Sequence, residues 1–276
     1  MSPDGRLEGL CLKSGPLGEN DRLLTLLSDG EGLTRLAVPG ARRPRSSLAA
    51  AVPLSLLQLQ VSGGSGLRRV RQLKVLRSYS QLAQRLETLA VAQALAELCL
   101  QLVPSGDGVA GVLDDLLMQL GRLEQVVKEH QPNLEALAIA VQGSVHLLAL
   151  GGYGLPLQSC ARSGRALEPP VGNWDWRCSL LPSLGLLIGA EAGAVLVLNA
   201  SELALLQRLP RPGLPRRRDG TLIGPEGVWL RLLQLVEVWG GEHLGRRCRA
   251  FSLLRGCFEP STRLAMGSEP SLPRNG

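Results

Sequence analysis

The run Leu57-Gln58-Leu59-Gln60-Val61 alternates apolar and polar side chains, which predicts a β-strand with one buried and one solvated face. Four other short apolar runs lie in the N-terminal part of the chain. They are Arg6 to Leu12, Arg22 to Ser28, Leu33 to Val38 and Leu67 to Arg77. Short runs of this kind, separated by turn residues, favour strands over helices.

Glycine-rich turns connect several of these runs. Asp29-Gly30-Glu31-Gly32 separates the second run from the third and supplies the positive φ that a hairpin needs, and Gly63-Gly64-Ser65-Gly66 precedes the last run. Five strands within about eighty residues predict a small closed barrel. The five-stranded oligonucleotide-binding (OB) fold is the commonest such barrel, and an SH3-like barrel fits the same pattern.

After Ser78 the apolar residues recur at intervals of three and four, as expected for helices. The predicted helices run from Leu82 to a turn at 104–108, from Val112 to Lys128, from Asn133 to Leu150, and from Pro225 to Gly256 with an interruption at Gly240-Gly241. The sequence therefore predicts an α+β protein with a barrel domain at residues 1–79 and a helical domain at 80–257. Residues 258–276 are predicted to form a loose tail.

The composition is that of a folded protein with an aliphatic core. Of the 276 residues, 45% are hydrophobic, 20% are charged and only 3% are aromatic. The six cysteines are scattered and residues 1–6 carry no positive-then-apolar leader, so we expect a reducing, cytoplasmic location. No uninterrupted apolar run reaches the roughly eighteen residues needed to cross a bilayer, so no membrane span is expected.

Charge is unevenly distributed along the chain. Residues 1–80 contain 12 Lys and Arg against 6 Asp and Glu, residues 81–199 contain 6 against 11, and residues 200–276 contain 12 against 7. The balances are +6, −5 and +5. Basic ends that flank an acidic middle predict different roles for the segments and favour a polyanionic partner for the ends.

The strongest local signal is the loop Gly40-Ala41-Arg42-Arg43-Pro44-Arg45-Ser46-Ser47 after the third strand. Guanidinium groups bind phosphate oxygens bidentately, and each neutralised phosphate releases counterions. A second basic set occupies the last strand of the same barrel, so a groove for a sugar-phosphate backbone is favoured over a merely solvated loop. The predicted nucleic-acid contacts are Arg42, Arg43 and Arg45, then Arg68, Arg69, Arg71 and Lys74, with Arg22 and Arg35 as further candidates.

Aromatic stacking is not available to the predicted barrel, because no Phe, Tyr or Trp precedes Tyr79. Binding should therefore be mainly electrostatic and weakly selective for sequence. Two further basic sets, at Arg211 and 216–218 and at Arg246, Arg247 and Arg249, could extend the surface, although plain solvated charge is the simpler interpretation for them.

Catalytic and metal-binding motifs were not found, which argues against an enzyme. The chain lacks the P-loop, the dinucleotide fingerprint, the nucleophile elbow and the His-Glu-x-x-His zinc motif. His146 is predicted to be a core histidine, and Asp114 and Asp115 are expected to face solvent. Cys160 and Cys178 belong to no Cys-x-x-Cys pair, so no cofactor is expected and a zinc site is disfavoured.

Three segments resemble the start of the bacterial RecO family of recombination mediators. They are Gly18-Glu19-Asn20-Asp21-Arg22-Leu23-Leu24-Thr25-Leu26-Leu27, Pro39-Gly40-Ala41-Arg42-Arg43-Pro44-Arg45-Ser46 and Pro53-Leu54-Ser55-Leu56-Leu57. Residues 150–156 and 246–254 also lie where that family has comparable features. The resemblance implies an N-terminal OB barrel, a helical domain, and a zinc-finger-like insertion at about 151–200 that is degenerate here, because Ser163 stands where a second cysteine would follow Cys160.

The resemblance also implies a function in DNA repair and recombination without catalysis. It implies binding of single- and double-stranded DNA, annealing of strands coated with single-strand-binding protein, and loading of RecA with the help of RecR. Two other interpretations stay open. One is a helical protein-interaction scaffold with merely solubilising basic ends, and the other is an RNA-binding OB protein.

Overall fold

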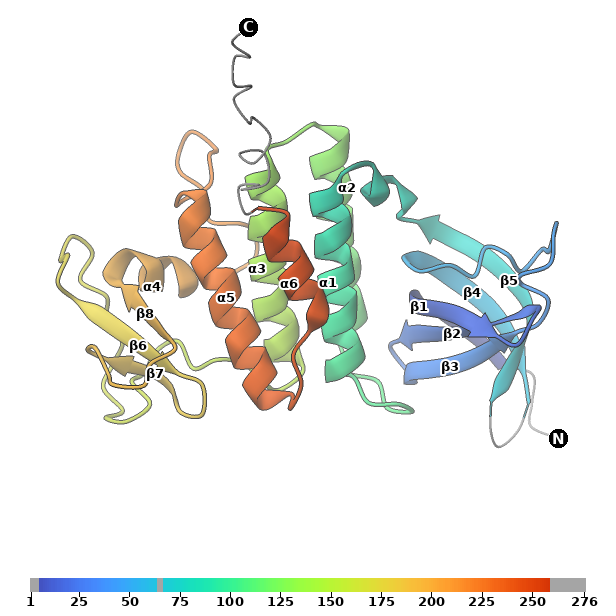
Figure 1. The fold of residues 1–276 in the computed structure, drawn as a ribbon, viewed down its shortest axis with the longest axis horizontal. Helices are drawn as coiled ribbons and strands as arrows, with labels where there is room; N and C mark the ends of the chain where they lie inside the picture. Colours follow the sequence, from blue (N-terminus) through green and yellow to red (C-terminus); the bar gives the residue numbers. More distant parts are fainter. Residues whose placement is uncertain (1–4, 64–66, 259–276) are drawn as a thin grey trace, which may run out of the picture.

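The computed structural model describes residues 5–63 and 67–258, and places a five-stranded barrel and a small sheet at opposite ends of a helical bundle (Figure 1). The barrel is closed in the order β1-β2-β3-β5-β4. Its strands are β1 (Gly5–Leu17), β2 (Asp21–Ser28), β3 (Gly32–Val38), β4 (Ser55–Ser62) and β5 (Arg68–Ser78). All neighbours pair antiparallel except β3 and β5, whose short parallel pairing closes the barrel. The predicted OB-type barrel is thus confirmed.

Alternating burial explains why these residues form a barrel. In β4 the side chains of Leu57, Leu59 and Val61 are at most 2% exposed, whereas Gln58 and Gln60 face outward, as the sequence pattern predicts. The barrel interior is almost wholly aliphatic. The predicted turn residues 64–66, the tail from 259 and the extreme N-terminus, 1–4, lie outside the described residues.

The helical domain begins with a short 3-10 turn, η1 (Ser80–Gln84). The helices that follow are α1 (Leu86–Leu102), α2 (Val112–Lys128), α3 (Asn133–Leu150), α4 (Ala200–Leu206), α5 (Glu226–His243) and α6 (Arg249–Gly256). α3 is central and packs against α1, α2 and α5. Among the described helices it alone is long and apolar enough to cross a membrane, and 61% of it is buried inside this bundle, as in a core helix.

Two local expectations differ from the structure. The last predicted helix does not break at Gly240-Gly241, because α5 continues through both glycines and the chain turns only at 244–248, where Gly245 has a φ of 71°. Asp114 is exposed as expected, but Asp115 is not solvated, because its carboxylate lies 3.1 Å from Nδ1 of His146.

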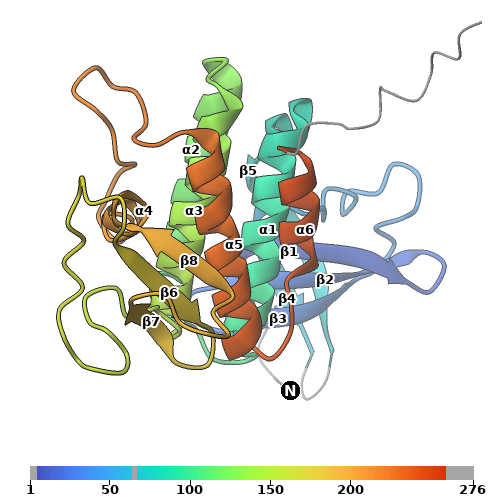
Figure 2. The same cartoon turned by 60° about the vertical axis from the view of Figure 1, so that its left-hand side comes forward.

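Residues 151–200 contain a small antiparallel sheet that the sequence did not predict (Figure 2). Its strands are β6 (Arg177–Leu181), β7 (Gly185–Ile188) and β8 (Leu196–Asn199), in the order β7-β6-β8. The strands are only four or five residues long, too short to show a clear alternation among the surrounding glycines and prolines.

The barrel is joined to the helices at two points, which fixes the space between them. At one, β5 leads through the buried Tyr79 into η1 and α1. At the other, the α1–α2 loop meets the β2–β3 turn, where the N–H of Leu33 donates to the carbonyl of Pro104 at 3.0 Å. Glycine is required there, since a Cβ on Gly108 would lie 1.6 Å from the carbonyl oxygen of Asp29.

Candidate nucleic-acid interface

One wall of the candidate site is the outer face of strands β1, β2 and β3. Lys13 is paired with Thr25, and Thr25 is paired with Arg35, so these three residues form a row across the strands. Their neighbours Leu24 and Leu36 point the other way and are fully buried in the barrel. The strand pairing therefore places two cations, with Thr25 between them, on the face that lines the groove opposite α1.

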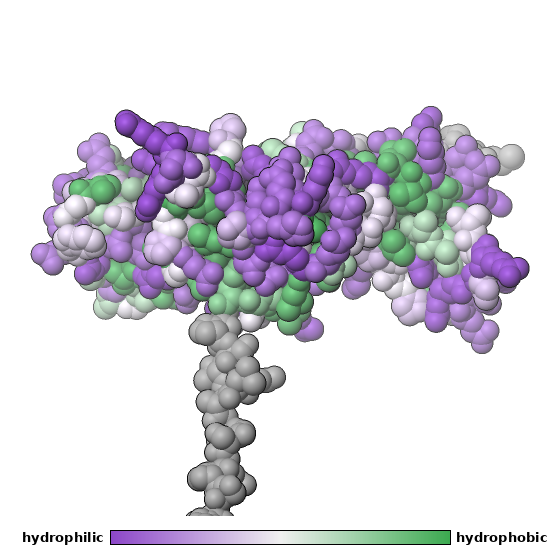
Figure 3. Space-filling model, turned by 90° about the horizontal axis from the view of Figure 1, so that it is seen from above, coloured by the Kyte–Doolittle hydropathy of each residue, from purple (hydrophilic) through white to green (hydrophobic). Residues whose placement is uncertain are grey.

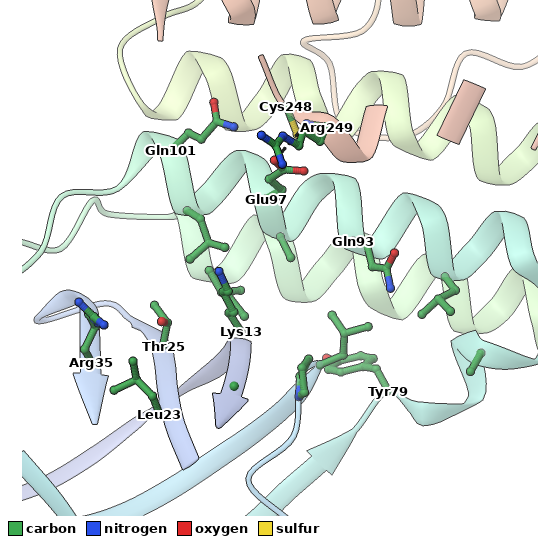
Figure 4. A pocket seen from close by; sticks show the side chains of 18 of the residues that line it. Lys13, Leu23, Thr25, Arg35, Tyr79, Gln93, Glu97, Gln101, Cys248 and Arg249 are labelled. Carbon is green, nitrogen blue, oxygen red and sulfur yellow. Dashed lines mark hydrogen bonds between the residues drawn. The ribbon is translucent and has the colours of Figure 1, made fainter. Parts of the chain in front are cut away.

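The other wall consists of α1 and the segment that leads into α6. Gln93, Glu97 and Gln101 recur every four residues along α1 and line the groove, with Glu97 beside Arg249 (Figure 4). The carboxylate of Glu97 accepts hydrogen bonds from the backbone N–H groups of Arg249 at 3.0 Å and Ala250 at 2.7 Å. These bonds satisfy two free donors at the start of α6 and hold the basic segment 246–249 against α1.

Between the walls lies an open groove with a volume of about 1520 Å³. This exceeds the about 300–1,000 Å³ of a typical small-molecule pocket, so a polymer suits it better. Five cationic side chains line the groove, against the single carboxylate of Glu97. The five are Lys13, Arg35, Arg246, Arg247 and Arg249. All five residues are exposed, whereas Glu97 is half-buried and engaged at the start of α6. The groove therefore presents a net positive surface.

The groove continues in both directions along the barrel. Gly15, Pro16 and Pro53 also line a neighbouring hollow that contains Arg22 and Arg42. On the other side, Leu23 and Arg35 are shared with a hollow that reaches Arg68. A concave path thus connects four of the predicted site residues, namely Arg22, Arg35, Arg42 and Arg68.

The arginine loop after β3 is held against the β1–β2 hairpin. The N–H of Arg42 donates to the carbonyl of Asn20 at 2.9 Å, and its guanidinium donates to the carbonyl of Gly18 at 2.9 Å. Arg22 donates to the carbonyls of Ala49 and Ala51 at 3.0 and 3.2 Å, so this side chain supports the loop. Arg43 and Arg45 are exposed at the loop surface, and neither guanidinium has a hydrogen-bond partner among the described residues.

The remaining predicted residues lie on β5. Arg69, Arg71 and Lys74 are exposed and do not line the groove or either hollow. Arg71 donates to the hydroxyl of Ser62 at 2.6 Å. Arg68 is committed to an ion pair with Glu31, and its hydrogen bonds hold the pKa of that carboxyl below its usual value. The structure therefore places Arg68 on the concave path, whereas Arg69, Arg71 and Lys74 form a separate exposed set on β5.

Sequence reasoning missed Lys13 and undervalued Arg246, Arg247 and Arg249, which it treated as solvated charge. Alternation along β1 could not have placed Lys13 on the outer face, because Leu12 lines the same groove and a register shift between Cys11 and Lys13 breaks the pattern. Nothing local could have joined the late arginines to the barrel, since only the tertiary fold brings residues 246–249 opposite residue 35.

The segment expected to be a degenerate zinc finger has a donor set that does not fit zinc. Burial raises the pKa of the Cys160 thiol, but hydrogen bonds from the Ser163 side chain and from the backbone at Ile188, Ser163 and Arg162 lower it to about 7. Burial, and to a smaller extent the neighbouring Cys160, raises the pKa of the Cys178 thiol to about 12. Among the described residues, no three His, Cys, Asp or Glu side chains gather where they could hold a metal ion.

Comparison with known proteins identifies the family. Residues 1–79 match the family described as Recombination protein O N terminal, and residues 83–250 match Recombination protein O C terminal. The chain is 66% identical to the DNA repair protein RecO of Prochlorococcus marinus (strain MIT 9313), over 92% of this chain and 96% of the relative. It is 65% identical to that of Synechococcus sp. (strain WH7803), over 94% and 96%. A more distant relative, from Cyanothece sp. (strain PCC 7425 / ATCC 29141), is 31% identical over 94% and 98%. The chain therefore belongs to the recombination protein O (RecO) family and has a role in recombinational DNA repair.

Proposed function

We propose that this protein is a non-catalytic mediator that binds single- and double-stranded DNA and anneals complementary strands. The observation that carries the proposal is the groove between the barrel and the helical domain, with its five exposed cations and one engaged carboxylate. A DNA backbone lies along this groove and reaches the arginine loop at residues 42–45. Its phosphates are neutralised by guanidinium and ammonium groups, which release counterions on binding.

Base stacking contributes little along this path. Tyr79, the aromatic residue in the groove lining, is only 1% exposed, and the guanidinium of Arg77 lies 4.7 Å from the centre of its ring. Binding in the groove is therefore ionic and independent of base sequence. A cationic surface of this kind also lowers the repulsion between two approaching strands, which is the physical requirement for annealing.

Family membership supports a proposal for the protein partners. We propose that the protein acts with RecR, on DNA coated with single-strand-binding protein, and thereby helps to load RecA. No covalent step is required of the protein, and no cofactor is needed for this role.

The direct test removes the charge of the arginine loop. In the variant Arg42→Ala/Arg43→Ala/Arg45→Ala, we expect weaker binding of a labelled single-stranded oligonucleotide, measured by fluorescence anisotropy, and slower annealing of complementary strands. The matched control is Lys128→Ala/Arg165→Ala/Arg208→Ala, which removes the same charge from exposed positions outside the groove and its hollows. Equal DNA affinity in the two triple variants would contradict the proposal and would favour a protein-interaction scaffold.

A further inference from the structure

The most exposed aromatic side chain of the described residues lies in the loop before β6. Trp174 is 82% exposed, whereas Trp229 is fully buried and Trp239 is only 6% exposed. Trp176, two residues after Trp174, is half-buried. Leaving an indole in water forgoes the burial that usually stabilises a large aromatic ring, so this position is unusual for a tryptophan.

The loop that carries Trp174 is held in place by local hydrogen bonds. The guanidinium of Arg177 donates to the carbonyl of Trp174 and, at 2.9 Å, to that of Trp176. The N–H of Asp175 donates to the side-chain oxygen of Asn173 at 3.0 Å. The indole is thus presented on a positioned backbone, which reduces the entropy lost when a ligand packs against it.

Trp174 forms one side of a hollow of about 250 Å³. The other lining residues are Arg177, Val197, Asn199, Glu202 and Arg231. Glu202 does not present a free negative charge, because its carboxylate accepts the N–H of Asn199 at 2.9 Å and Nε of Arg231 at 2.6 Å. The same ion pair offsets the charge of Arg231, whose guanidinium also donates to the carbonyl of Val197. The hollow therefore combines one exposed ring, one net positive charge from Arg177 and a single apolar neighbour, Val197.

This combination matches the chemistry of an unpaired nucleotide. The flat ring of a base stacks on an indole, and guanidinium groups bind the adjoining phosphates. A protein-docking surface would instead have a contiguous apolar centre with a polar rim, whereas this lining is mostly polar. The hollow lies beside β6 and β8, at the end of the molecule opposite the barrel (Figure 1). It is therefore separate from the groove.

We propose that Trp174 is a stacking platform for an unpaired base of a nucleic-acid strand, with Arg177 beside the adjoining backbone phosphate. The inference rests on the proposed function in one respect, namely that the ligand is a nucleic acid. A second contact at the far end of the molecule lets one protein hold a single strand at two separated points, or hold two strands at once. Duplex DNA, whose bases are already stacked, is not recognised here.

The test compares Trp174→Ala with Trp174→Phe in the full chain, using oligo(dT) and a duplex of equal length. For oligo(dT) we expect an affinity loss of about five-fold or more in Trp174→Ala, from the usual contribution of one stacked base, and a much smaller loss in Trp174→Phe. Oligo(dT) should quench the intrinsic fluorescence of the parent more strongly than that of Trp174→Ala, since Trp229 and Trp239 are buried and the half-buried Trp176 does not line the hollow. Duplex affinity should be unchanged.

Val171→Ser is the control, because Val171 is 70% exposed in the same loop but does not line the hollow. Equal oligo(dT) affinity for Trp174→Ala and the parent would overturn the platform while leaving the proposed function intact. An equal loss in Val171→Ser, or a loss of RecR binding alone, would also overturn it in favour of a protein-docking loop. A loss in Trp174→Ala with no loss in the arginine-loop variant would support the platform and contradict the proposed function.

Discussion

At the scale of single residues, His146 shows how a polar contact can be built into an aliphatic core. Its Nδ1 lies 3.1 Å from a carboxylate oxygen of Asp115, and its Nε2 lies 2.8 Å from the carbonyl oxygen of Leu209. Both neighbours are acceptors, so both ring nitrogens donate when the ring is protonated. The hydrogen bond to Asp115 raises the pKa of His146, against the lowering effect of burial. The ring links α2 and α3 to Leu209, which opens the proline- and arginine-rich loop at 209–220.

This geometry predicts how stability depends on pH. Because the folded-state pKa is raised, the contribution of His146 is fully present below the unfolded pKa of about 6.5 and is lost as pH rises through the folded pKa. The free energy of unfolding of the parent should therefore exceed that of His146→Gln most at about pH 6, and the difference should shrink toward about pH 9. Urea unfolding across this range measures it. A difference that is constant or grows with pH would show that the ring is neutral in the folded protein.

At the scale of elements, the joint between the barrel and the helices depends on close backbone approach. Gly32 has a φ of 57°, and a Cβ there would lie 2.1 Å from the carbonyl oxygen of Asp107. Gly108 faces the carbonyl of Asp29 in the same joint. Side chains at these positions would push the α1–α2 loop away from the β2–β3 turn, and both segments line the hollow that continues the groove toward Arg68.

We therefore expect Gly108→Ala to lower the free energy of unfolding by about 1–3 kcal/mol, the usual cost of overpacking. Gly121→Ala is the matched control, since it adds the same methyl group inside α2, where a Cβ meets nothing within 4 Å. That control should be neutral or stabilising by up to about 1 kcal/mol, because Ala has the higher helix propensity. Thermal or urea unfolding distinguishes the two. Equal stability of both variants would mean that the joint is not tightly packed.

The sequence predicted those elements whose pattern is local. The alternation in β4 and the apolar spacing of α2 were sufficient, because one face of each element is buried. α3, in which all residues from Glu135 to Ser144 are buried, was predictable instead from its start at Pro132-Asn133 and its long apolar run. The path of α5 through Gly240-Gly241 could not be predicted, since its continuity depends on packing against α3, where Leu148 contacts Gly240. The basic residues on the helical side of the groove could not be predicted from the sequence either. The clustering of Arg42, Arg43 and Arg45 is visible in the sequence, whereas residues 246–249 join them only through the fold.

At the scale of the whole molecule, two chemically different surfaces lie at opposite ends of the helical bundle. The groove beside the barrel offers cations, and the hollow beside the small sheet offers an exposed indole with two guanidinium groups. Seen from above, hydrophilic side chains cover most of the visible face, with smaller hydrophobic patches between them (Figure 3). This face is better suited to a hydrated polyanion than to an extensive apolar contact.

The central claim is that DNA phosphates occupy the groove, and the salt dependence of binding tests it most directly. Lys13, Arg35 and Arg247 line the groove, and their side chains make no hydrogen bond to any described residue, so Lys13→Ala/Arg35→Ala/Arg247→Ala should fold normally. The measurement is the affinity for oligo(dT) as a function of salt concentration, in the parent and in this variant. If each cation neutralises one phosphate, the slope of log K against log salt should be shallower by about 2 in the variant, from about 0.7 per phosphate of a single strand. An unchanged slope would show that the strand does not enter the groove.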